Sequence, residues 1–201
     1  MKKGMLIGLS LGVILVIFAV MIFIWGKNTY NNMVTLNETV TQSWSQVENQ
    51  YQRRTDLIPN LVETVKGYAN FEKSVLVDVT EARAKVSQLN VNKDILNDPQ
   101  AFQKFQALQG SLSGALSRLL VTVEKYPELK ANQNFLSLQA QLEGTENRIA
   151  VERKRFNETV QNYNTTIKLF PASTIAGMFG FSPKQYFQST PGTEVPPAVK
   201  F

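Results

Sequence analysis

The chain has 201 residues, 43% of them hydrophobic, which is enough for one membrane-spanning segment and one domain with its own core. It contains neither cysteine nor histidine, which excludes disulfides, thiol nucleophiles, imidazole bases and the zinc or haem sites that use these side chains. Of the 21 basic residues, Lys2, Lys3 and Lys27 flank an apolar N-terminal stretch, and the remaining 18 nearly balance the 16 acidic residues. Acidic and basic residues alternate beyond that stretch without forming a basic face, so nucleic acid is not expected as a partner.

The N-terminal stretch predicts a membrane anchor. Residues 4–26 carry no charge, and a helix of that length, at about 1.5 Å per residue, spans the roughly 30 Å core of a bilayer. A cleaved signal peptide is the alternative, because Lys2 and Lys3 form a basic start. Its apolar region would be too long, however, and no small-x-small cleavage site precedes Trp25. We therefore expect a short N-terminal segment over residues 1–4 and a single transmembrane helix over residues 5–26.

Two further features of the anchor bear on its orientation and contacts. Lys2 and Lys3 precede it and only Lys27 closely follows it, which predicts a cytoplasmic N-terminus and a soluble domain on the other side of the membrane. Three glycines spaced four residues apart lie on one face of this helix; they are Gly4, Gly8 and Gly12. Such a face permits close contact with another membrane helix. The alternative is an accidental spacing, since glycine is common in membrane helices.

Beyond the anchor, apolar residues recur at steps of three and four, which predicts amphipathic helices. A first helix is expected over residues 29–53, followed by a break near residues 55–59 and a second helix that ends near Leu89. One long helix kinked at Pro59 is the alternative. We prefer the separate second helix because proline is tolerated in a first turn, and because one unbroken helix would outrun its partners.

The later helices have clearer boundaries. Asp98-Pro99 is a helix start signal, and Tyr126-Pro127 ends that helix. Within it, residues 110–115 read Gly-Ser-Leu-Ser-Gly-Ala, without the Gly-Lys-Ser/Thr ending or the preceding strand of a phosphate-binding loop. We expect another helix to pack closely on these small residues. A last helix begins near Asn132 and continues to Phe170.

These elements predict an all-α fold, with a single N-terminal transmembrane helix followed by an elongated up-and-down bundle of about four helices. The bundle is expected over residues 28–170, with the two amphipathic helices between residues 112 and 170 as its spine. No strand-like alternation occurs before the C-terminal segment.

Polar residues crowd the apolar stripes near the middle of the predicted bundle. They are Glu48, Asn49, Arg53, Glu143, Glu146, Arg148, Glu152 and Arg153. We interpret them as a half-buried layer of hydrogen bonds and ion pairs that fixes the register of the helices. The alternative is a site in which two carboxylates act as acid and base or hold a metal pair. The di-iron version of that site needs histidine, which the chain lacks.

The composition changes after the last helix. Residues 171–188 form an aromatic-rich segment that contains Ile175, Met178, Phe179, Phe181, Tyr186 and Phe187. These side chains either fold back on the end of the bundle or form an exposed apolar patch that binds another subunit or protein. Residues 189–201 contain three prolines and are expected to form an extended tail.

Several blocks are long enough to be specific. They are VENQYQRRTDLIPNLVETVKGY at residues 47–68, LSGALSRLL at 112–120, EKYPELKANQNF at 124–135, LEGTENRIA at 142–150, Tyr163-Asn164, and KQYF at 184–187. These blocks resemble the LemA family, over nearly the whole chain beyond Tyr30. The resemblance implies a bacterial-type, single-pass membrane protein with a helical bundle. It supplies no reaction, substrate or catalytic residue.

Together these observations predict a membrane-anchored interaction or scaffold protein rather than an enzyme, without catalytic residues, cofactor or metal. We expect it in the bacterial cytoplasmic membrane, forming homo-oligomers and contacting other membrane or envelope proteins. One alternative is a module that senses a small ligand or peptide in a cavity lined by Trp44, Tyr51 or Tyr68. Another is an enzyme that uses the cluster around Glu146, with a carboxyl pKa raised by burial.

Overall fold

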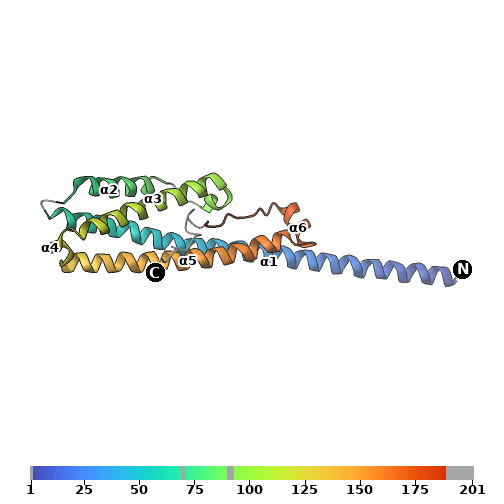
Figure 1. The fold of residues 1–201 in the computed structure, drawn as a ribbon. Helices are drawn as coiled ribbons and strands as arrows, with labels where there is room; N and C mark the ends of the chain where they lie inside the picture. Colours follow the sequence, from blue (N-terminus) through green and yellow to red (C-terminus); the bar gives the residue numbers. More distant parts are fainter. Residues whose placement is uncertain (1, 69–70, 90–92, 189–201) are drawn as a thin grey trace, which may run out of the picture.

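The structure, a computed structural model, describes residues 2–68, 71–89 and 93–188, and all regular elements in these ranges are helical. In chain order they are α1 (Lys2–Lys66), α2 (Lys73–Ser87), the 3-10 helix η1 (Lys93–Asn97), α3 (Pro99–Val123), α4 (Pro127–Lys130), α5 (Gln133–Lys168) and α6 (Ala172–Phe179) (Figure 1). The predicted all-α fold, an elongated bundle preceded by a long apolar helix, is confirmed.

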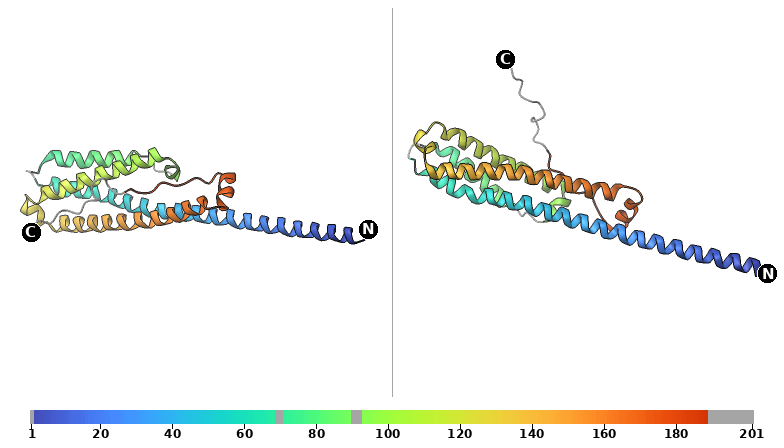
Figure 2. Two further views of the ribbon diagram at one scale, coloured as in Figure 1. Left: turned by 45° about the vertical axis from the view of Figure 1, so that its right-hand side comes forward. Right: turned by 90° about the horizontal axis from the view of Figure 1, so that it is seen from below.

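The four long helices alternate in direction, and α1 projects alone from one end of the bundle (Figures 1 and 2). The main packing partners are α1 with α5 and α2 with α3, so the bundle consists of two antiparallel helix pairs laid side by side. The short helix α4 turns the chain between α3 and α5 at the far end, whereas α6 packs against α1 and α5 at the end from which α1 projects.

The helix α1 runs without interruption for 65 residues, so the break expected near residues 55–59 is wrong. Pro59 lies inside the helix and faces solvent. Because proline has no N–H, the carbonyl of Thr55, four residues earlier, loses its usual helical donor. The Nε of Arg83, from α2, donates a hydrogen bond to that carbonyl at 3.3 Å. A contact with a neighbouring helix thus replaces the missing bond, and α1 continues to Lys66.

The predicted starts of α3 and α5 are confirmed by their caps. The carboxylate of Asp98 accepts hydrogen bonds from the backbone N–H groups two and three residues further on, at 2.9 and 3.1 Å. The side-chain oxygen of Asn132 does the same at the start of α5, also at 2.9 and 3.1 Å. Each cap satisfies two N–H groups that the first turn of a helix leaves without partners.

The core of the bundle is divided into two apolar clusters. The far cluster, beside α4, includes Ile58, Leu61, Val79, Leu112, Leu119 and Phe135. The near cluster, toward the projecting end of α1, includes Met33, Trp44, Phe102, Phe105, Phe156 and Tyr163. Four buried polar residues lie between the clusters on α1, α3 and α5; they are Arg54, Thr55, Gln109 and Thr145. A polar layer therefore separates the two halves of the core.

The extended segment of residues 181–188, here called the strap, runs from α6 back toward the middle of the bundle (Figure 1). The side-chain amide of Asn164 donates to the carbonyl of Lys184 at 2.9 Å and accepts from its N–H at 2.8 Å. Asn157, two turns earlier on α5, makes the same pair of bonds with Phe187, both at 2.9 Å. The strap is therefore held by its main chain.

The six apolar residues predicted as an interaction patch divide between the two interpretations. The ring of Phe187 is buried in the near cluster, 5.0 Å from the ring of Phe102 and 5.5 Å from that of Phe156. Ile175 and Phe181 are half-buried against the same cluster. The remaining three, Met178, Phe179 and Tyr186, are exposed. Part of the segment thus folds back on the bundle, and part of it faces outward.

The projecting part of α1 is apolar and exposed. An 18-residue stretch of the helix has a mean hydropathy of 2.1 with none of it buried, and is long and apolar enough to cross a membrane. A Cβ added to Gly8 or Gly12 would meet no atom within 4 Å. The surroundings of Gly4 and the tail of residues 189–201 lie outside the described part of the chain.

We expect the substitution Asn164→Ala to release the strap. The variant loses both hydrogen bonds to Lys184, and at about 1 kcal/mol each they correspond to a roughly tenfold or larger increase in the open fraction. Trypsin should then cleave after Lys184 at least about tenfold faster, as followed by mass spectrometry. Asn162→Ala, an exposed position on the same helix, is the control. Equal cleavage rates for the two variants would contradict this role of Asn164.

Candidate functional site

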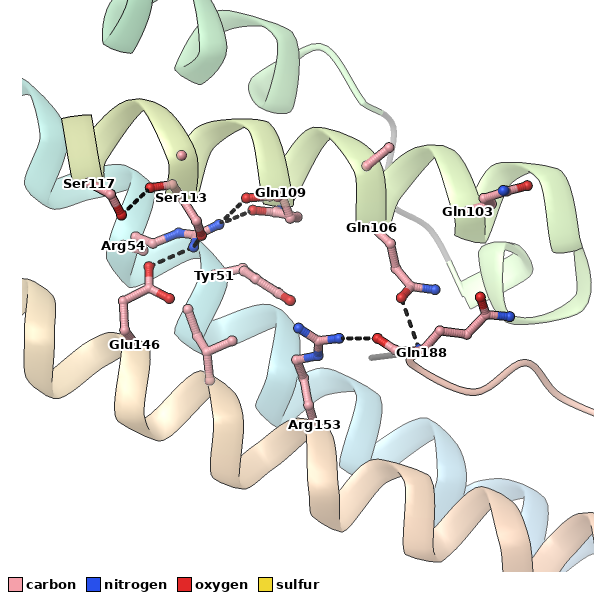
Figure 3. Close-up of a pocket in the computed structure, with 14 residues that line it drawn as sticks. Tyr51, Arg54, Gln103, Gln106, Gln109, Ser113, Ser117, Glu146, Arg153 and Gln188 are labelled. Carbon is pink, nitrogen blue, oxygen red and sulfur yellow. Dashed lines mark hydrogen bonds and ion pairs between the residues drawn. The ribbon is translucent and has the colours of Figure 1, made fainter. Parts of the chain in front are cut away.

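A cleft of about 590 Å³ opens between α3 and α5 at mid-length of the bundle, with α1 at its base (Figure 3). The wall on α3 consists of small and amide-bearing residues, including Gln106, Gln109, Gly110, Ser113, Gly114 and Ser117. Tyr51 and Arg54 from α1 form the base, and Gln188 of the strap lies at one end. The volume falls in the range of about 300–1,000 Å³ that is typical of ligand-binding pockets.

Arg54 joins three helices at this cleft. Its side chain, on α1, is 1% exposed. One terminal nitrogen, Nη1, donates to Oε1 of Glu146 on α5 and to Oγ of Ser113 on α3, both at 2.6 Å. The other, Nη2, donates to the side-chain oxygen of Gln109 and to its carbonyl, at 3.3 Å. One guanidinium therefore connects the α1–α5 pair to the α2–α3 pair.

The two members of the ion pair have different environments. Arg54 is buried, whereas the side chain of Glu146 is 42% exposed and reaches the water of the cleft. A buried charge is tolerated when an opposite charge and further hydrogen bonds compensate its lost hydration. The Nε of Arg54 is the exception, because it is buried without an acceptor among the described residues. The pair thus stabilises a charge that is itself costly to bury.

Tyr51 places a hydroxyl group beside the two arginines of the cleft. Burial raises the pKa of this phenol, and the positive charges of Arg153 and Arg54 partly oppose that effect. The hydroxyl group is therefore protonated at neutral pH and can donate a hydrogen bond. The guanidinium carbon of Arg54 lies 5.2 Å from the centre of the Tyr51 ring.

At the other end of the cleft, the main chain of Gln188 is bound on both sides. Nη2 of Arg153, on α5, donates to its carbonyl at 3.0 Å, and its N–H donates to Oε1 of Gln106, on α3, at 3.1 Å (Figure 3). The guanidinium of Arg153 also lies over the ring of Phe187, 4.6 Å from its centre. The C-terminal end of the strap therefore adjoins the cleft.

The eight polar residues predicted as a core layer lie in different environments in the structure. Glu146 pairs with Arg54 and Arg153 lines the cleft. Glu152 is half-buried and bonded to Arg155 at 2.8 Å. Glu48 is half-buried and lines a smaller cavity of about 290 Å³. The remaining four are exposed, namely Asn49, Arg53, Glu143 and Arg148.

The buried arginine at the end of the predicted layer is Arg54, and not its neighbour Arg53. The signal was present, because the apolar stripe on α1 continues through position 54; its members are Trp44, Val47, Tyr51, Ile58, Leu61 and Val65. The break expected near residues 55–59 interrupted this stripe and concealed the position. Gln109 follows the same rule, because it falls between Phe105 and Leu112 on the stripe of α3.

Two other expectations concern the lining of the cleft. Another helix was expected on the small residues of α3, but a Cβ added to Gly110 or Gly114 meets no atom within 4 Å in the described part of the chain. These residues instead form an open wall. Of the three aromatic residues named for a binding cavity, Tyr51 lines the cleft and Trp44 lies in the near cluster. The third, Tyr68, accepts a hydrogen bond from Asn132 at 3.0 Å.

We expect Glu146→Gln to lower the free energy of unfolding by about 2–3 kcal/mol, because it leaves the buried guanidinium of Arg54 without its counter-charge. Glu143→Gln, an exposed carboxylate one turn away, should change it by less than about 0.5 kcal/mol. Urea unfolding in detergent, followed by Trp44 fluorescence in a Trp25→Phe background, measures both.

The double variant Arg54→Met/Glu146→Gln measures the interaction free energy between the two side chains. It should be less destabilised than the sum of its two single variants, because each single variant leaves the other partner uncompensated. Strict additivity would mean that Glu146 does not balance the burial of Arg54.

Comparison with known proteins identifies the family. Residues 43–201 match the LemA family. The chain is also similar to magnetosome proteins MamQ 1 and MamQ 2 of Paramagnetospirillum magneticum, with 27% identity to each over 184 aligned residues, covering 83% of this chain and 67% of theirs. Magnetosome protein MamQ of Magnetospirillum gryphiswaldense is 28% identical over the same coverage. Because the family match includes the whole bundle beyond Ser43, with the cleft and the strap, the chain belongs to the LemA family.

Proposed function

We propose that this protein is a membrane-anchored scaffold that holds a rigid helical bundle at a membrane surface and binds other proteins there. The observation that supports this best is the continuity of α1, which is an exposed apolar helix at one end and a core helix of the bundle at the other. No linker separates the two parts, so the bundle has a fixed direction relative to its anchor. The names of the MamQ relatives refer to a cellular structure, the magnetosome, and to no reaction.

The expected location is the cytoplasmic membrane of a bacterium, with the N-terminus in the cytoplasm and the bundle outside it. The flanking charges support this orientation, because Lys2 and Lys3 lie on one side of the apolar stretch and Lys27 on the other. The orientation can be tested with a reporter enzyme that is active only in the cytoplasm, fused after Phe201. Activity of this reporter would contradict the predicted orientation.

Self-assembly through the anchor is part of the proposal. Gly8 and Gly12 face open space along one side of α1, so the backbone of a second anchor can approach closely there. The bundle would then be presented in two or more copies.

We expect this assembly to be detectable by disulfide crosslinking, because the chain has no cysteine of its own. In membranes, Gly8→Cys and Gly12→Cys should form oxidised dimers at least about threefold more efficiently than Ile14→Cys, which points away from the glycine face. Gel electrophoresis without reducing agent gives the dimer fraction. Equal, low fractions at all three positions would contradict assembly through this face.

A second candidate function is peptide binding in the cleft. The strap supports it, because the side chains of Asn157, Asn164 and Arg153 already donate hydrogen bonds to the main chain of an extended segment that ends at the cleft. The open wall at Gly110 and Gly114 leaves room for a further segment beyond Gln188.

Two substitutions at Gly114 distinguish the effect of filling the cleft from an effect on the stability of the fold. Gly114→Ala adds only a Cβ and should raise the free energy of unfolding by up to about 1 kcal/mol, whereas Gly114→Trp should fill the cleft. A photo-crosslinking residue at Gln103, on the rim, should capture a polypeptide in cells in the Ala background and lose it in the folded Trp variant. Capture that persists in both backgrounds would argue against the cleft as a binding site.

A further inference from the structure

We propose that α6 and the corner before it form a second membrane contact, which enters the interfacial layer of the bilayer beside the anchor. The apolar side chains that make this contact, here called the interface patch, are Leu169, Phe170, Met178 and Phe179. The inference rests on the proposed anchoring of α1. It adds a lipid-binding surface on the bundle itself, some 140 residues further along the chain than the anchor.

The side chains of the interface patch are apolar, yet they are largely exposed. Phe170 is 86% exposed, Met178 is 73% exposed, and Leu169 and Phe179 are close to 60% exposed, at 59% and 58%. All four lie within residues 169–179, and soluble proteins seldom present so many large apolar side chains together unless they bind something. The question is therefore what covers them.

The position of α6 on α1 answers this question. A Cβ on Gly26 would lie 3.8 Å from Cδ1 of Ile175, and the ring of Tyr30 lies 4.7 Å from that of Phe179. The uncharged stretch of α1 ends at Gly26, and Tyr30 is about 6 Å further along the helix. The interfacial layer on each side of a bilayer is about 5–8 Å thick. The interface patch therefore lies at the depth at which the anchor leaves the hydrocarbon.

The charges at this end of the bundle fit a lipid surface. Residues 1–37 and 159–188 contain no aspartate or glutamate, whereas Lys27 follows Gly26 on α1 and Lys168 directly precedes the patch in sequence. Basic residues close to the bilayer attract anionic headgroups, and aromatic residues are enriched at this depth. Trp25 and Tyr30 of α1 are 40% and 36% exposed there. The apolar surface of the anchor thus continues onto α6, which selects lipid as the occupant.

The arrangement in the figures agrees with this assignment. The helix α6 lies at the end of the bundle from which α1 projects, and the C-terminal end of α5 reaches the same level (Figures 1 and 2). A bilayer crossed by the projecting part of α1 would meet α6 before any other helix of the bundle.

The test uses the full chain in vesicles of phosphatidylcholine and phosphatidylglycerol, with single cysteines that carry an environment-sensitive fluorophore. Met178→Cys probes the interface patch, Leu15→Cys probes the anchor, and Val121→Cys, which is 68% exposed on α3, serves as the aqueous control. Lipids with a quencher near the headgroup should quench the fluorophore at position 178 at least about threefold more than at position 121. Its emission should also shift to shorter wavelength. All three positions are exposed, so folding is not at risk.

The outcomes separate this inference from the proposed function. Suppose that lipids labelled deep in the acyl chains quench the fluorophore at position 15, and that headgroup-labelled lipids quench the one at 178 no more than the one at 121. The anchor then stands and the lipid contact is wrong. A fluorophore at 178 that shifts to shorter wavelength without quenching is covered by protein, which also overturns the proposal. If position 15 is not quenched by lipids labelled deep in the acyl chains, anchoring itself fails and the inference fails with it.

Discussion

The bundle depends on one buried charge. Arg54 lies where the far and near clusters meet, and its guanidinium reaches Glu146 on α5 and both Gln109 and Ser113 on α3. The closest backbone packing is that of α1 with α5 and of α2 with α3. Both apolar clusters join these two pairs, and Arg54 adds the polar contacts between them at mid-length. A charge buried in this way needs its partners in place, and its bonds tie α3 and α5 to α1 at mid-length of the bundle. The cleft persists because these polar contacts hold its base while the small residues of α3 leave its wall open.

Continuity of α1 is the second constraint, and it depends on a contact between helices. Pro59 removes one helical hydrogen bond, and Arg83 of α2 supplies a replacement donor to the carbonyl that is left. Because the helix does not break, the direction of the anchor is also the direction of the core helix against which α5 and α6 pack. The position of α6 next to Gly26 is therefore a consequence of packing in the bundle, and it does not depend on a linker.

Local signals in the sequence predicted the elements that depend on local chemistry. Asp98 and Asn132 cap their own helices, so both starts were visible, and the three- and four-residue spacing gave the fold class. The predictions that were wrong concern residues whose partners lie far away in the sequence. Pro59 is locally a break, whereas in the fold α1 is packed on its neighbours and a side chain 24 positions away donates to the carbonyl that the proline leaves without its helical donor. The expected break then hid Arg54, whose place on the stripe is evident once α1 is continuous. The hold of Asn157 and Asn164 on the strap has no local signature, because an asparagine on a half-polar face resembles any exposed residue.

The length of α5 sets the distance between the cleft and the end of the bundle from which α1 projects. Glu146 lies 22 residues before Lys168, which at about 1.5 Å per residue is roughly 33 Å along the helix axis. The interfacial layer of a bilayer extends only about 5–8 Å beyond the hydrocarbon, so a cleft at this height is outside the headgroups. With α1 spanning a bilayer as proposed, a lipid of that bilayer does not reach the cleft. The proposed ligand of the cleft is accordingly a soluble molecule or a polypeptide that rises well above the surface. The strap that ends at the cleft is itself a polypeptide segment bound through its main chain.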